Sequence, residues 1–149
     1  MRKLSIVLFL LVTVSLSSFA GNPVNNSPAF KGMEHFMRTF PQATEVDCKN
    51  KGEFTEVNFI WKGLQLQAFY DQEGNPVATS RQISIDNLPL TVQIMLKDKY
   101  PGFIATTAIE FDDNTAGLSY YVAAAGPKTS YLLHVSTDGN ISVFKKMRN

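Results

Sequence analysis

The sequence predicts an α+β domain: a tandem repeat of a helix plus a four-stranded antiparallel sheet, with the helices on one sheet face and an open concave face opposite. The first observation is that the spacing of hydrophobic residues changes from helical to alternating twice along the chain. The second is that paired residues recur, because Phe40-Pro41 returns as Tyr100-Pro101 and Gly74-Asn75 returns as Gly139-Asn140. We therefore expect one domain over 29–149, made of repeats at 29–85 and 86–149.

Residues 1–20 have the three parts of a cleavable signal peptide. Arg2 and Lys3 supply positive charge, and an apolar run follows over 4–16. Ser18 and Ala20 then place small residues at positions −3 and −1 of a cleavage site. A membrane anchor is the alternative, but a spanning helix needs about 20 apolar residues. We expect cleavage near Ala20-Gly21, a flexible leader over 21–28, a periplasmic or secreted location, and no membrane span after cleavage.

Two helices are expected where hydrophobic residues recur at helical spacing. The first begins at Ser27-Pro28, because serine caps helices and proline suits the first helical position. It ends before Pro41, and the second helix runs from Asn87-Leu88-Pro89 to the residue before Pro101. The residues expected to face the core are Phe30, Met33, Phe36, Met37 and Phe40 in the first helix, and Val92, Met95, Leu96 and Tyr100 in the second.

Alternating apolar and polar residues predict the strands, and the hairpin around Lys62-Gly63 is the most constrained of them. A two-residue turn there pairs Trp61 with Leu64 and Phe59 with Leu66, so every apolar partner falls on one side. A slip of one residue would place glutamines in the core. The other strands are expected around 46–48, 77–83, 107–111, 118–124, 131–135 and 141–143.

Charge and composition exclude several classes of function. The chain has 14 Lys and Arg against 13 Asp and Glu, and removal of Arg2 and Lys3 with the signal changes its formal charge from +1 to −1. A nucleic-acid-binding protein usually shows a basic patch, so we expect no nucleic-acid partner. No serine lies in a Gly-x-Ser-x-Gly motif, and no catalytic constellation is evident. We therefore expect a protein that is not an enzyme and has no cofactor.

The isolated reactive residues have structural interpretations. His35 is expected to face solvent. Cys48 alternates with Val46 on an inward face, where cysteine behaves as a small hydrophobe, although a disulfide between two chains stays open. The segments 71–73 and 112–114 resemble fragments of calcium loops, but calcium takes roughly six to eight oxygen ligands. We interpret both as solvated turns and expect no metal site.

The sheet face that the core does not use is the remaining candidate site. Its residues are partly polar and partly aromatic, as in many protein interfaces, and an ordinary solvated face is the alternative interpretation. The candidate binding residues are Glu56, Asn58, Ile60, Gln65, Gln67, Phe69, Tyr121, Leu132, His134 and Phe144.

Short motifs in both halves make the chain resemble a known family of exported proteins. The first half has Phe40-Pro41, Phe69-Tyr70-Asp71 and Glu73-Gly74-Asn75, and the second has Leu88-Pro89, Tyr100-Pro101-Gly102 and Asp138-Gly139. They resemble the PepSY-like, beta-lactamase-inhibitor-like proteins of Bacteroidetes-type bacteria over about 29–147. The resemblance implies two helix-plus-four-strand repeats, a concave sheet surface, export, and binding or inhibition of another protein. Val46-Asp47-Cys48 departs from the family, in which an aromatic residue often follows the valine.

These observations together predict an exported, non-enzymatic module that binds or inhibits a protein or peptide through the open sheet face. The alternative is a periplasmic protein that binds a small ligand or a metal.

Overall fold

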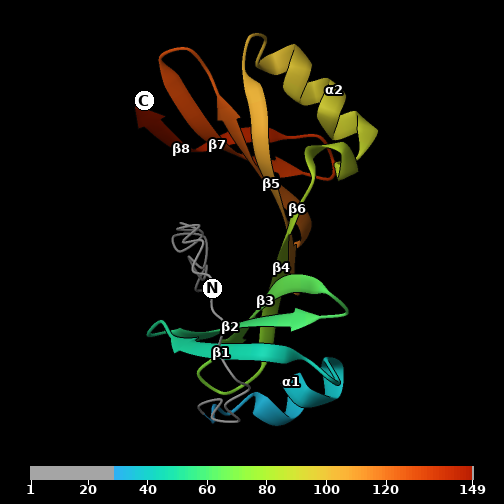
Figure 1. Cartoon of the computed structure of the whole chain (residues 1–149). Coiled ribbons are helices and arrows are strands. Elements are labelled where there is room, and N and C mark those ends of the chain that lie inside the picture. Colours follow the sequence, from blue (N-terminus) through green and yellow to red (C-terminus); the bar gives the residue numbers. More distant parts are fainter. Residues whose placement is uncertain (1–28, 149) are drawn as a thin grey trace.

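A computed structural model describes residues 29–148 of the chain (Figure 1). The predicted signal peptide over 1–20, the leader over 21–28 and the helix start at Ser27-Pro28 lie outside the described residues.

Eight strands form one antiparallel sheet in the order β1-β2-β3-β4-β5-β6-β7-β8, so each strand pairs with the next strand in the chain. The helices precede β1 and β5. The elements are α1 (Met33–Thr39), β1 (Thr44–Asn50), β2 (Phe54–Trp61), β3 (Leu64–Asp71), β4 (Pro76–Ile83), the 3₁₀ helix η2 (Ile85–Asn87), α2 (Leu90–Lys99), β5 (Ile104–Asp113), β6 (Gly117–Ala125), β7 (Thr129–Ser136) and β8 (Ile141–Arg148).

The predicted fold class, a tandem repeat of helix plus four-stranded sheet, is wrong. The structure is mostly a single eight-stranded sheet, to which two short helices of 7 and 10 residues are added. β4 pairs continuously with β5, from Ala78 opposite Asp113 to Ile83 opposite Ala108. Alternation within a segment predicts a strand but not its partner, so the sequence did not show that the sheet continues through this join. The division at 29–85 and 86–149 stays a prediction.

The predicted hairpin register between β2 and β3 is confirmed. Trp61 lies opposite Leu64, Phe59 opposite Leu66, and Val57 opposite Ala68. Lys62 and Gly63 have φ values of 51° and 76°, as a two-residue turn that follows the twist of the strands requires.

Both helices lie on the same side of the sheet (Figure 1). The pairing continues from Leu66 to Arg81, then to Glu110 and Tyr120, so these residues share one face of the sheet. α1 packs Phe36 against Val57, Phe59, Ala68 and Tyr70, while α2 packs Val92 and Leu96 against Ala108, Tyr120, Val122, Ala124, Leu133 and Val135.

The predicted first and last residues agree better with the structure for α2 than for α1. α2 ends at Lys99, one residue before the predicted end, with Tyr100 as its C-cap, and its Val92 and Leu96 are buried. α1 begins only at Met33, and its Met37 is 65% exposed, so the prediction that Met37 faces the core is wrong. Neither helix is long and apolar enough to cross a membrane in the described part of the chain.

Candidate binding face

All ten candidate residues lie on the sheet face opposite the helices, which we call the helix-free face. On β2 and β3, Asn58 lies opposite Gln67, and Gln67 lies opposite Ser80 of β4. The same face continues through Phe111 to β6 and β7, where Tyr121 lies opposite His134. Cross-strand pairing thus connects candidates from both halves of the chain on one surface.

An aromatic row crosses this face from β2 to β8. Neighbouring ring centroids are 5.9 Å apart for Phe54 and Phe69, 6.0 Å for Phe69 and Phe111, 6.0 Å for Phe111 and Tyr121, and 5.4 Å for Tyr121 and Phe144. Several of these pairs meet edge to face, an arrangement that aromatic rings favour. The row is therefore a third, small hydrophobic core, and it lies on the face that has no helices.

The expectation of an open face fails at this row. Phe69 and Tyr121 are each only 4% exposed, although they point away from the helices. Alternation identifies which residues share a face, but it does not tell how closely rings from different strands approach one another. Phe54 and Phe111 belong to the same row and were not among the predicted residues.

His134 and Leu132 border the aromatic row on β7 and are half-buried. The His134 ring lies 5.0 Å from the ring of Tyr121. Burial lowers the pKa of His134 below its ordinary value, because the charged imidazolium loses hydration. Burial therefore favours the neutral form of His134 where the ring packs against Tyr121.

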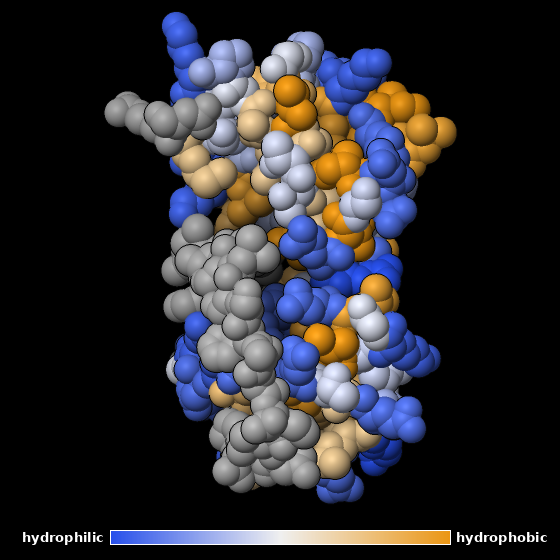
Figure 2. Space-filling model, viewed as in Figure 1, coloured by the Kyte–Doolittle hydropathy of each residue, from blue (hydrophilic) through white to orange (hydrophobic). Residues whose placement is uncertain are grey.

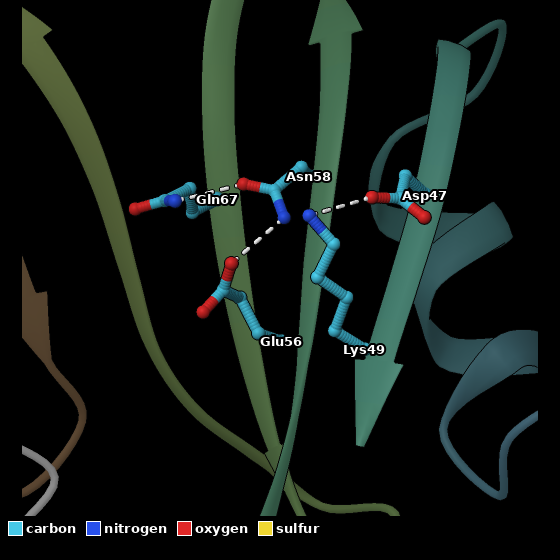
Figure 3. Close-up of polar contacts among 5 residues, drawn as sticks. All are labelled: Asp47, Lys49, Glu56, Asn58 and Gln67. Atoms are coloured by element: carbon cyan, nitrogen blue, oxygen red, sulfur yellow. Dashed lines mark hydrogen bonds and ion pairs between the residues drawn. The ribbon is translucent and has the colours of Figure 1, made fainter. Parts of the chain in front are cut away.

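A chain of polar side chains lies beside the row on β2, β3 and β4, and Figure 3 shows its members on β2 and β3. The buried Ser80 hydroxyl donates to Gln67 Oε1 at 3.0 Å, and Gln67 Nε2 donates to Asn58 Oδ1 at 2.7 Å. Asn58 Nδ2 donates in turn to Glu56 Oε1 at 2.8 Å. All donors in this amide chain therefore point toward one carboxylate, and such chains polarise their members cooperatively.

An ion pair on the edge strand β1 extends the polar region. Lys49 Nζ lies 3.0 Å from Asp47 Oδ2, and Lys49 is the cross-strand partner of Glu56 (Figure 3). The hydrogen bond that Lys49 donates to the Asp47 carboxylate is the main cause that raises the pKa of Lys49. Asp47, Lys49 and Ser80 were not predicted, although continued alternation from Glu56 into the neighbouring strands would have placed them on this face.

The other reactive residues contribute to the core under α1. His35 is half-buried rather than solvent-facing, and its Nδ1 lies 3.3 Å from the Tyr70 hydroxyl. Burial raises the pKa of Tyr70 to about 12, so this hydroxyl stays protonated. Cys48 is half-buried beside the same core, where burial and then Asp47 raise the pKa of its thiol. A raised pKa disfavours the reactive thiolate.

The two acidic loops form turns, as predicted. Asp71 accepts hydrogen bonds from the backbone and side chain of Asn75, and Asp113 accepts from the backbone amides of Thr115 and Ala116. Their oxygens therefore stabilise the local backbone. Over 29–148, no group of three or more His, Cys, Asp or Glu side chains could hold a metal ion.

Solved structures of Bacteroides proteins share this fold. A BLIP-like protein of Bacteroides fragilis has a TM-score of 0.67 and 20% identity, over 78% of this chain and 84% of its own. A DUF2874 family protein of Bacteroides uniformis has a TM-score of 0.71 and 15% identity, over 82% and 89%. A protein of Bacteroides eggerthii, predicted to be periplasmic, has a TM-score of 0.69 and 9% identity, over 86% and 90%.

The predicted resemblance to BLIP-like proteins is confirmed at the level of the fold by these similarities. No protein family and no curated protein matches the sequence itself.

Proposed function

We propose that the chain is an exported, non-enzymatic module that binds a protein or peptide through the helix-free face. The observation that carries this proposal is the amide chain from Ser80 through Gln67 and Asn58 to Glu56.

The amide chain leaves hydrogen-bonding capacity for a partner. Each side-chain amide has two N–H donors, and the chain uses one from Gln67 and one from Asn58. Among residues 29–148, the second N–H of each amide has no acceptor, and the two amides lie on strands that are direct neighbours. Such donors suit backbone carbonyls of a bound segment. The half-buried Ile60 beside them adds apolar area, as protein interfaces require.

A binding role also agrees with how the reactive side chains are used. His134 packs on Tyr121, His35 contacts Tyr70, and Cys48 borders a core. Export is supported by the signal pattern over 1–20 and by the fold shared with a protein predicted to be periplasmic. The name of the BLIP-like neighbour favours inhibition as the form that binding takes.

Site-specific photocrosslinking tests the proposed face. Benzoylphenylalanine replaces Gln65, which is exposed on the helix-free face, and in a matched control it replaces Lys99, which is exposed on α2. In the organism that produces the protein, we expect a discrete covalent adduct from position 65 and none from position 99. Mass spectrometry then identifies the adduct.

A second variant tests whether the amide chain takes part. Glu56→Gln keeps the shape of the side chain but removes the charge that orients the donors, so we expect it to weaken the adduct formed from position 65. Equal adducts from positions 65 and 99, or none from either, would contradict the assignment of the face.

A further inference from the structure

We propose that a cavity between α2 and the start of β5 binds a small apolar carboxylate. The cavity lies on the helix side of the sheet and shares no residue with the helix-free face. It has a volume of about 230 Å³. Its walls include Leu96, Tyr100, Phe103, Ala105 and Ala124.

The volume of the cavity limits the size of its ligand. An apolar protein cavity of about 150 Å³ holds one benzene molecule. Pockets for drug-sized ligands have volumes of roughly 300–1,000 Å³. A cavity of about 230 Å³ therefore suits one aromatic ring with a short substituent, or a short alkyl chain.

The walls offer little to a polar ligand. Gln93 lines the cavity, but its Nε2 donates to the Leu88 carbonyl oxygen at 2.8 Å and is held by the segment that precedes α2. Phe103 packs against Tyr100 and Tyr131, with ring centroids 6.0 and 5.2 Å away, which fixes the aromatic wall. The part of a ligand inside the cavity should therefore be a hydrocarbon.

One charged residue lines the cavity, and it is Lys97 in the last turn of α2. The ion pairs found over 29–148 join Asp47 to Lys49 and Arg81 to Glu110, so Lys97 is in neither. Its exposed ammonium can meet an anion at the cavity mouth while the cavity holds the hydrocarbon. A carboxylate on a short apolar body satisfies both requirements.

Apolar surface continues outside the cavity along α2. Leu90 is 71% exposed and Ile94 is 51% exposed. Figure 2 shows apolar surface at the upper right, where α2 lies in Figure 1. Leu90 and Ile94 lie seven and three residues before Lys97, a spacing that places them on the same side of the helix as Lys97.

Titration of the purified, isotopically labelled protein with octanoate, followed by NMR, tests the proposal. We expect saturable shifts of the backbone amides of the cavity residues. Acetate carries the charge without the chain, and octanol carries the chain without the charge, so both should bind more weakly. Shifts confined to the helix-free face, or no saturable shift at all, would overturn the proposal.

Two lysine variants separate a specific contact from general charge. Lys97→Gln should weaken octanoate binding about three- to fivefold, the size expected for an exposed ion pair, and leave octanol unchanged. Lys99→Gln removes an exposed charge from the same helix outside the cavity and should leave both ligands unchanged. Equal effects of the two variants would overturn the role of Lys97.

A variant that fills the cavity provides the last test. Ala105→Leu adds volume at a half-buried position of the wall and should abolish octanoate binding while circular dichroism still shows the folded protein. If a folded Ala105→Leu protein binds octanoate as well as the original, the ligand lies elsewhere and the proposal fails.

Discussion

At the residue scale, Gly32 and Gly74 allow close packing between the turn after β3 and the residues that precede α1. A side chain at Gly32 would lie 2.5 Å from the Tyr70 ring. A side chain at Gly74, in the turn between β3 and β4, would lie 2.7 Å from the backbone of Lys31. The turn thus packs directly on the chain that enters α1, and neither position has room for a Cβ atom.

Gly74→Ala should therefore destabilise the protein more than Gly52→Ala. Both glycines have positive φ, at 91° and 84°, so each substitution costs about 1–2 kcal/mol in backbone strain. Only Gly74 adds a clash with the backbone, and overpacking of this kind costs a further ~1–3 kcal/mol. Urea unfolding of both variants measures the difference. Equal losses would show that the turn moves freely away from α1.

His134 should make stability depend on pH. Burial lowers its pKa in the folded protein below the ordinary value of 6.5, so the unfolded chain binds the proton more tightly. The stabilisation that the neutral, buried His134 contributes to the free energy of unfolding is complete above about pH 6.5. It declines as the pH falls from there through the pKa of the folded protein, and the free energy then stays constant with respect to this group. His134→Gln should remove this decline in urea unfolding measured between pH 7.5 and 5. An unchanged decline would assign it to other groups.

At the element scale, β2 and β3 show how far sequence reasoning reaches. Alternation fixed the register of this hairpin, because a slip would have placed glutamines in the core. The same reasoning placed Phe69 correctly on the helix-free face but not in a buried row. Ring contacts between distant strands depend on the pairing of β4 with β5, which local patterns do not show. The face was therefore predictable, and its buried aromatic centre was not.

Gln67 and Gln65 should differ in their contribution to stability. Gln67→Ala leaves the buried Ser80 hydroxyl without its acceptor, and an unsatisfied buried polar group costs about 1–3 kcal/mol. Gln65 is exposed on the same face of the same strand, so Gln65→Ala should change stability by less than about 0.5 kcal/mol. Thermal and urea unfolding compare the two. A neutral Gln67→Ala would mean that water replaces the lost acceptor.

At the scale of the whole molecule, the aromatic row connects two separate helix-side cores. One core lies under α1 and the other under α2, and different residues form them. On the opposite face, Phe111 of β5 contacts both Phe69 of β3 and Tyr121 of β6. The row thus joins strands from both ends of the sheet, and we expect the intact protein to unfold in one cooperative transition.

Phe111→Ala should weaken this cooperativity as well as stability. Loss of a buried Phe ring costs about 3–5 kcal/mol, and here it also separates the two cores. Trp61 is the only tryptophan and borders the core under α1, so its fluorescence reports on that half. Fluorescence and far-ultraviolet circular dichroism should coincide for the original protein and diverge for the variant. If the fluorescence and circular dichroism unfolding curves also coincide for the variant, the pairing of β4 with β5 is enough to make the parts of the sheet under α1 and α2 unfold together.

The strict order of the sheet, in which every strand pairs with its successor, also has a kinetic meaning. Each strand of this sheet pairs only with strands that neighbour it in sequence, so the loops closed during folding are short. Folding should therefore be fast for a β-rich protein. The longest interval between successive partners is the connection from β4 to β5, which contains α2. When the chain emerges with its N-terminus first, from a ribosome or through a membrane, each strand can pair with the preceding strand as soon as it appears. Growth of the sheet should be delayed only between β4 and β5, while the segment that contains α2 emerges.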